Sequence, residues 1–85
     1  MYYVYLLYSL KDKKFYIGFT SNLKDRVKTH NAGGAPATKN RRPCKLIFYE
    51  GFLAKGDALR REKYFKTNPG KKSLHLILRE TLSLI

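Results

Sequence analysis

Two segments near the start of the chain have the hydrophobic pattern of β-strands. Residues 2–9, YYVYLLYS, place apolar or aromatic side chains on both alternating faces. Such a strand is typical of the middle of a sheet that is covered on both sides. Residues 15–19, FYIGF, follow a polar turn of roughly four residues and predict the second strand of a hairpin. Gly18 within this strand indicates a close approach of another group to the backbone.

The period of the apolar positions then lengthens, which predicts a helix from about residue 23 to residue 31. Ser21 or Asn22 is suited to its N-cap, and the glycine pair at 33–34 follows its end. Residues 32–45, AGGAPATKNRRPCK, form a small, polar and then basic stretch. A loop of this length is more typical of a functional segment than of a simple connection.

The second half of the chain predicts one more strand and two more helices. Residues 46–52, LIFYEGF, have strand composition, and Asp57 is suited to cap a helix over 58–66 that ends at Asn68-Pro69-Gly70. A last helix is expected from about Lys72. Its apolar side is predicted to consist of Leu74, Ile77, Leu78, Leu82 and Ile85. The fold class is therefore α+β, with a small three-stranded sheet flanked by helices in the order β-β-α-β-α-α.

The length of 85 residues and the 44% content of hydrophobic residues fit one domain, residues 1–85, with a single small core. The 18 Lys and Arg residues against 6 Asp and Glu give a net charge of +12, which is far more than solubility requires. A polyanion is the partner that this charge indicates, and nucleic acid is favoured over a membrane surface because no basic amphipathic helix with an exposed apolar face is evident.

Cys44 is the only cysteine, so no internal disulfide and no cysteine-based zinc site can form. No apolar run has the roughly 18 residues of a membrane span, and no signal-peptide pattern is present. We expect a cytoplasmic protein with no membrane partner. The oligomeric state is open, with a monomer as the working expectation.

Three titratable residues lie within or beside the apolar stripes of the predicted helices. With Leu59 as reference, Glu62 falls inside the apolar arc of its helix, where a carboxylate needs a cation or several donors to offset desolvation. A pairing with Arg60 or Lys66 is the alternative. Arg26 and His30 lie one turn apart beside the stripe of the first helix.

Arg26 and His30 could therefore point into a cleft between helix and sheet. The alternatives are that Arg26 stacks on a tyrosine and that His30 is an ordinary residue at a helix C-terminus. Tyr5 and Tyr16 are predicted to share one face of the hairpin, where Arg26 also arrives.

These residues together resemble the GIY-YIG nuclease superfamily, in its stand-alone single-domain bacterial branch. Tyr3-Val4-Tyr5 corresponds to the first signature and Tyr16-Ile17-Gly18 to the second, with eleven positions between the two tyrosines. Arg26 follows Tyr16 by ten positions and His30 follows it by fourteen. Tyr3-Val4 departs from the Gly-Ile of the family name.

The resemblance implies a divalent-metal-dependent endonuclease that hydrolyses phosphodiester bonds, with DNA expected before RNA and little sequence specificity. It implies that Glu62 is the metal ligand, for Mg²⁺ or Mn²⁺, that Arg26 engages the scissile phosphate, that Tyr16 or Tyr5 is the base, and that His30 supports them. It also suggests a role in DNA repair. Asn68 is given no role, although many relatives have an asparagine in the last helical segment.

A basic surface is expected to hold the nucleic-acid backbone without reading its sequence. Its predicted members are Lys39, Arg41, Arg42, Lys45, Lys71 and Lys72. Two alternatives remain open from the sequence: a basic binding module that keeps the pocket without catalysis, and a structural or ribosome-associated basic protein.

Overall fold

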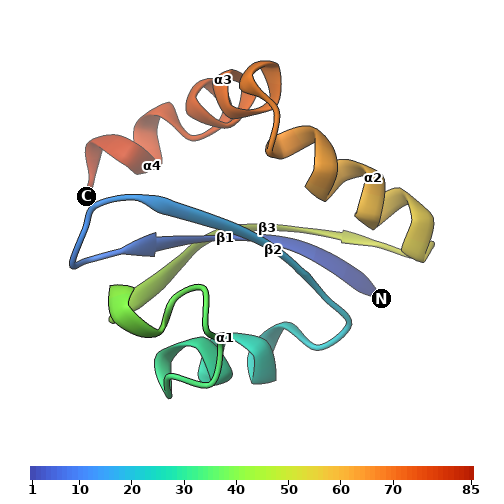
Figure 1. Cartoon of the computed structure of the whole chain (residues 1–85). Coiled ribbons are helices and arrows are strands. Elements are labelled where there is room, and N and C mark those ends of the chain that lie inside the picture. Colours follow the sequence, from blue (N-terminus) through green and yellow to red (C-terminus); the bar gives the residue numbers. More distant parts are fainter.

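The computed structural model describes residues 1–85 and contains one antiparallel sheet (Figure 1). Its strands are β1 (Tyr2–Ser9), β2 (Phe15–Thr20) and β3 (Cys44–Phe52), in the spatial order β2-β1-β3. The doubly apolar β1 is the central strand, as its pattern predicts. The third strand begins two residues earlier than its predicted start at residue 46.

Helices cover both faces of this sheet. Figure 1 shows α1 on one side and α2, α3 and α4 on the other. The helices are α1 (Leu23–Asn31), α2 (Lys55–Phe65), α3 (Asn68–Ile77) and α4 (Arg79–Ser83), and a short 3₁₀ turn, η1 (Lys39–Arg41), lies in the long loop. The α+β class and the predicted element order are confirmed.

The two faces of β1 belong to two different hydrophobic clusters. Val4 and Leu6 pack against the helices that follow β3, with Phe65 as the largest buried side chain from that layer. Tyr5 and Leu7 point to the opposite face, where α1 lies. Alternate residues of one strand therefore fill both layers of the core.

The start of α2 differs from the prediction. The helix begins at Lys55, with Ala54 as an N-cap that has no side-chain hydrogen bond, so Asp57 is not the cap. Asp57 lies in the first turn instead, where its charge favours the helix dipole.

The start of α3 is also earlier than predicted. Helix α2 ends at Phe65, and Asn68-Pro69-Gly70 forms the first turn of α3. The Thr67 side chain caps this turn by accepting a hydrogen bond from the Gly70 amide, and proline is tolerated at this position. A side chain on Gly70 would overlap the Tyr64 carbonyl, so the joint between α2 and α3 is tight. The last helical segment is divided at Leu78 into α3 and α4.

Two predicted apolar stripes are partly wrong. In α2, Ala58 and Phe65 are buried while Leu59 is 41% exposed. Arg61 is half-buried because it lies over the Phe65 ring at 4.3 Å and forms an ion pair with Glu50. In the last segment, Leu74 and Leu78 are buried and Leu82 is partly buried. The remaining two residues of that predicted stripe, Ile77 and Ile85, are exposed.

Candidate active site

The centre of the candidate site is the phenol of Tyr5. Tyr5 on β1 pairs with Gly18 on β2, and a side chain at Gly18 would overlap the Tyr5 ring and hydroxyl. The ring therefore lies against β2 at the one position where that strand has no side chain. It is 1% exposed. The close approach predicted at Gly18 is confirmed, and the group that approaches is Tyr5.

Helix α1 supplies two groups to this phenol. The Nε of Arg26 donates to Tyr5 Oη at 3.4 Å, and His30 Nε2 lies 2.8 Å from the same oxygen. The helix is fixed at its start by Asn22, whose side chain accepts from the Asp25 amide. One helical turn separates the arginine from the histidine, so both reach the same hydroxyl.

His30 connects Tyr5 to the long loop. Its Nδ1 lies 2.6 Å from Thr38 Oγ1, and both His30 and Thr38 are fully buried. Arginine can only donate, so the proton of a neutral Tyr5 hydroxyl is directed at His30 Nε2. Nε2 then accepts, and the ring proton lies on Nδ1 and is donated to Thr38. The Tyr5 proton thereby selects the tautomer, and Thr38, whose hydroxyl can accept as well as donate, holds the orientation of the imidazole.

Burial and charge set the protonation of this cluster. Burial raises the pKa of Tyr5 above its ordinary value of 10.0, although the hydrogen bond from Arg26 acts in the opposite direction. Burial, together with the charge of Arg26, lowers the pKa of His30 below 6.5. Desolvation therefore outweighs the positive charge of Arg26 in setting the pKa of Tyr5. At neutral pH both Tyr5 and His30 are uncharged.

Tyr16 lies beside this cluster on the edge strand β2. Its ring centroid is 6.3 Å from that of Tyr5 and 5.0 Å from that of His30. It pairs with Leu7 and therefore faces the same side of the sheet as Tyr5, as predicted for diagonal neighbours. Tyr16 is half-buried, whereas Tyr5 is enclosed, so the two phenols differ in their access to solvent.

Glu62 lies on α2, in the other helical layer, and makes no hydrogen bond to the tyrosine cluster. Its side chain is 21% exposed, and its carboxylate pairs with Lys66 Nζ at 3.3 Å, one turn further along the helix. Its negative charge also contributes to the raised pKa of Tyr5, as the smallest of the causes. The pairing with Lys66 that the sequence left open is therefore present, and Arg60 pairs with Asp57 instead.

The donor set limits which metal ion this site fits. No three histidine, cysteine, aspartate or glutamate side chains are grouped so that they could hold an ion. One half-buried carboxylate suits a hard cation such as Mg²⁺, which keeps several waters and also binds substrate phosphates. It does not suit zinc, which takes three or four protein ligands.

The predicted basic surface is divided into two groups. Lys39, Arg42 and Lys45 are exposed around the long loop, and Lys71 and Lys72 are exposed on α3. The sixth member, Arg41, is engaged inside the chain. Its Nε pairs with Asp12 at 2.6 Å, and its Nη2 donates to the Phe15 carbonyl at 3.1 Å.

Comparison with known proteins identifies the class that this fold and site define. Residues 1–74 match the family model described as the GIY-YIG catalytic domain, and the chain belongs to this family of nucleases, whose substrates are nucleic acids. None of its helices combines the length and the apolar composition that crossing a membrane requires.

Its relatives are small bacterial proteins. The chain is 45% identical to the UPF0213 protein SH2523 of Staphylococcus haemolyticus over 76 residues, which cover 88% of this chain and 92% of that protein. It is 52% identical to the UPF0213 protein YazA of Bacillus subtilis over 63 residues, or 73% of this chain and 64% of that protein. The names of these relatives state no activity.

A solved structure supports the fold. The solution NMR structure of the UPF0213 protein BH0048 from Bacillus halodurans aligns with a TM-score of 0.56 and 34% identity, covering 91% of this chain and 85% of that one.

Proposed function

We propose that this protein is a divalent-metal-dependent endonuclease that hydrolyses phosphodiester bonds in DNA. The observation that carries the proposal is that Arg26 and His30 both hydrogen-bond the hydroxyl of Tyr5, with Tyr16 beside them. A buried hydroxyl held between a guanidinium and an imidazole is more than packing requires. The net charge of +12 supports a polyanionic substrate.

Arg26 is the group that we assign to the scissile phosphate. Its Nε donates to Tyr5 Oη and the guanidinium also interacts with Tyr16, and its five N–H donors are enough to reach phosphate oxygens as well. Guanidinium binds phosphate with paired hydrogen bonds, and these strengthen as negative charge develops on the phosphoryl oxygens. The Tyr5 hydroxyl orients the guanidinium by accepting a hydrogen bond from its Nε.

Tyr16 is the tyrosine that we assign as the base. Tyr5 is enclosed and keeps its proton because burial raises its pKa. The half-buried Tyr16 can meet a water molecule. In the proposed step, the oxygen of water bonds to phosphorus while its proton passes to the hydroxyl oxygen of Tyr16, which gives its own proton to solvent. The bond between phosphorus and the ester oxygen breaks, and that oxygen takes a proton from solvent.

Glu62 is the residue that would hold Mg²⁺ or Mn²⁺, and the half-buried position of its carboxylate fits this role. The metal, when bound, supplies stabilisation of the charge on the phosphate and on the leaving oxygen. Lys66, which pairs with Glu62, would be free to bind a neighbouring phosphate when the carboxylate holds the metal.

The test is cleavage of supercoiled plasmid and of single-stranded DNA with Mg²⁺ or Mn²⁺. Wild-type protein is expected to cut, and Glu62→Gln is expected to lose activity by about 10²-fold or more. Glu80→Gln is the matched control, since this exposed carboxylate lies on α4. Glu62→Gln that cuts as well as wild type would contradict the proposal. Salt-dependent binding without cleavage under any metal condition would favour a non-catalytic binding module.

A further inference from the structure

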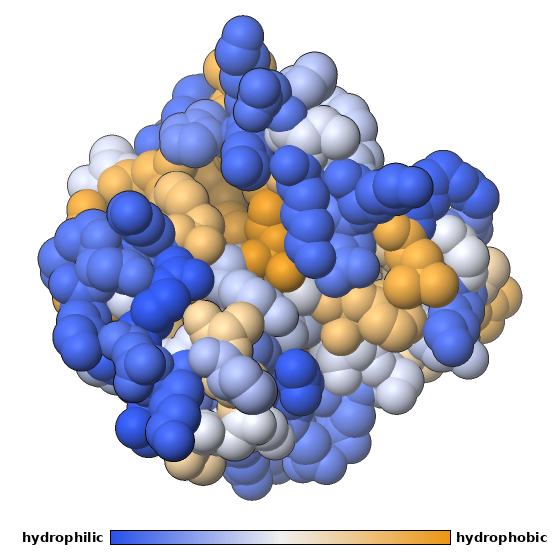
Figure 2. Space-filling view, in the orientation of Figure 1, coloured by the Kyte–Doolittle hydropathy of each residue, from blue (hydrophilic) through white to orange (hydrophobic).

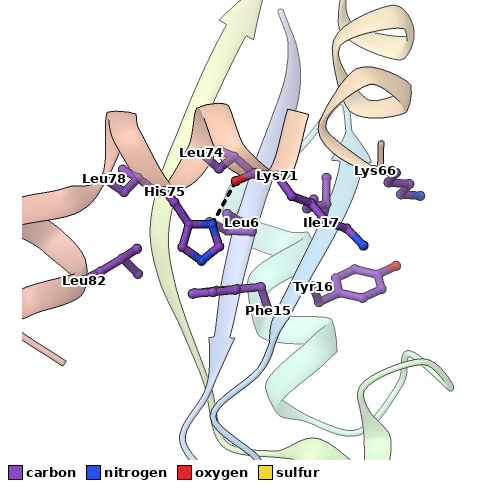
Figure 3. A pocket seen from close by; sticks show the side chains of 10 residues that line it. All are labelled: Leu6, Phe15, Tyr16, Ile17, Lys66, Lys71, Leu74, His75, Leu78 and Leu82. Carbon is purple, nitrogen blue, oxygen red and sulfur yellow. Dashed lines mark hydrogen bonds between the residues drawn. The ribbon is translucent and has the colours of Figure 1, made fainter. Parts of the chain in front are cut away.

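A cavity of about 380 Å³ adjoins the candidate site on the other side of β2. Its walls are apolar and come from the hairpin and from α3 and α4 (Figure 3). They consist of Leu6, Phe15, Ile17, Leu74, Leu78 and Leu82. Figure 2 shows hydrophobic residues around a hollow near the middle of this face, framed by hydrophilic side chains. An apolar hollow of this size in such a charged protein is typical of a binding site.

The rim of the cavity is polar and cationic. Lys66, Lys71 and Tyr16 lie at one end, and His75 lies over Phe15 between that end and the leucines of the other (Figure 3). The His75 ring meets the Phe15 ring edge-on at 5.9 Å, and its Nδ1 donates to the Lys71 carbonyl at 2.8 Å. An uncharged apolar ligand would make no use of the two lysines. The occupant that fits presents an apolar or aromatic face and is attached to negative charge.

Tyr16 connects this cavity to the proposed reaction centre, because it lines the cavity and also contacts His30. Every phosphate in a nucleic-acid strand is followed by a sugar that bears a base. A phosphate held at Arg26 therefore brings a base close to a hollow that begins at Tyr16. Lys66 and Lys71 are placed to bind the phosphates on that side.

We infer that this cavity is a subsite for one unstacked nucleobase of the bound strand, with Phe15 and His75 as its aromatic contacts. The inference rests on the proposed function, because the strand is the substrate of that reaction. A base inside a duplex is paired and stacked and must leave the helix to enter such a pocket. The subsite therefore favours nucleic acid with an unpaired nucleotide next to the scissile bond.

The test compares two strands of the same length and phosphate number: an oligodeoxynucleotide, and a backbone in which every base is replaced by an abasic tetrahydrofuran. Binding is measured by fluorescence anisotropy with EDTA present, so that cleavage does not interfere. Wild-type protein is expected to bind the base-bearing strand about tenfold more tightly, as expected for one stacked base. Leu82→Trp, which fills the cavity, is expected to remove this difference.

Leu76→Trp is the matched control, because Leu76 lies on α3, is 67% exposed and does not line the cavity. It is expected to keep the preference for the base-bearing strand. Equal binding of both strands by wild type, or a preference that survives in Leu82→Trp, would overturn the inference while leaving the proposed function standing. Failure of wild type to bind either strand would overturn both.

A second measurement needs no variant. Methyl NMR spectra of wild-type protein are recorded during titration with deoxyadenosine monophosphate and, separately, with inorganic phosphate. The methyl signals of Leu74, Leu78 and Leu82 are expected to shift with the nucleotide and not with phosphate. Methyl signals that stay in place with the nucleotide would overturn the inference.

Discussion

Gly18 determines whether Tyr5 can occupy its position. The phenol of Tyr5 lies where a side chain of residue 18 would have to be, so the two positions form one packing unit across the strands. The hydroxyl reaches His30 and Arg26 only because the ring passes this point without obstruction.

Gly18→Ala is therefore expected to displace the Tyr5 ring, abolish cleavage and lower the melting temperature. Overpacking of a core position typically costs about 1–3 kcal/mol. Activity and thermal unfolding are measured beside Gly56→Ala, since a methyl group at Gly56 meets no atom within 4 Å. The control should keep full activity and should not lose stability, because alanine is the better helix former. An active, fully stable Gly18→Ala protein would contradict the packing argument.

Individual residues of the site differ in how well the sequence reveals them. Helical spacing was sufficient to place Arg26 and His30 beside one face, and strand alternation was sufficient for Tyr5 and Tyr16. Thr38 was missed, because a single polar residue in an irregular loop has no periodic signal. Its burial depends on a tertiary contact with His30 that no local pattern contains.

At the scale of elements, the long loop is attached to the turn of the hairpin. The Ser9 hydroxyl donates to the Arg41 carbonyl at 2.6 Å, and Asp12 pairs with the Arg41 guanidinium. These contacts fix η1, which follows directly after Thr38. The orientation of His30 therefore depends on an ion pair in another part of the chain.

Asp12→Asn is expected to lower the melting temperature at pH 7. The hydrogen bond from Arg41 lowers the pKa of Asp12 from 3.8 to about 2. Between these two pH values the carboxylate is ionised in the folded chain and protonated in the unfolded chain. This stabilisation is present above pH 3.8 and is lost as the pH falls through about 2. Melting curves of wild type and variant should therefore differ at neutral pH and converge only below about pH 2.

Asp57→Asn provides the comparison for that experiment. Asp57 also pairs with an arginine, Arg60, but both side chains are more than half exposed. Exposed pairs of this kind contribute little. A variant at Asp57 that is destabilised as much as Asp12→Asn would show that the position of the ion pair is unimportant.

The elements themselves were predicted well in type and less well in their bounds. Asn68-Pro69-Gly70 reads equally as the end of one helix and the start of the next, because proline disrupts a helix interior but is tolerated in a first turn. Thr67 resolves this ambiguity in the structure. The apolar stripe of α2 was predicted in the wrong place because Arg61 packs over the Phe65 ring. A hydrophobic pattern counts arginine as polar and so does not register this contact.

On the scale of the whole molecule, the charge of +12 is not neutralised internally. The structure contains four ion pairs, which involve Arg41, Arg60, Arg61 and Lys66. Most of the 18 basic side chains are thus left for an external partner. The sequence alone was sufficient to predict a polyanionic partner, because net charge does not depend on loop geometry. It was also sufficient to predict the central place of β1, because a strand with two apolar faces needs cover on both sides.

Binding to single-stranded DNA is expected to weaken steeply with salt. The logarithm of the association constant should fall against the logarithm of salt concentration by about 0.7 per phosphate contacted. A double variant, Lys71→Gln with Lys72→Gln, should reduce this slope by about 1.4. Lys55→Gln, at the exposed start of α2, should leave the slope unchanged. A slope that does not respond to the double variant would remove α3 from the binding surface.

Tyr5 belongs to the strand that is hydrogen-bonded on both sides and packed on both faces. The hydroxyl therefore cannot be withdrawn while the sheet stays whole. Heating or denaturant should accordingly extinguish the activity in one cooperative step, together with the tertiary structure. A reversible change of shape that removed this hydroxyl from the site would have to dismantle the sheet, so control of the protein is expected to act on its amount or on its access to nucleic acid rather than on its conformation.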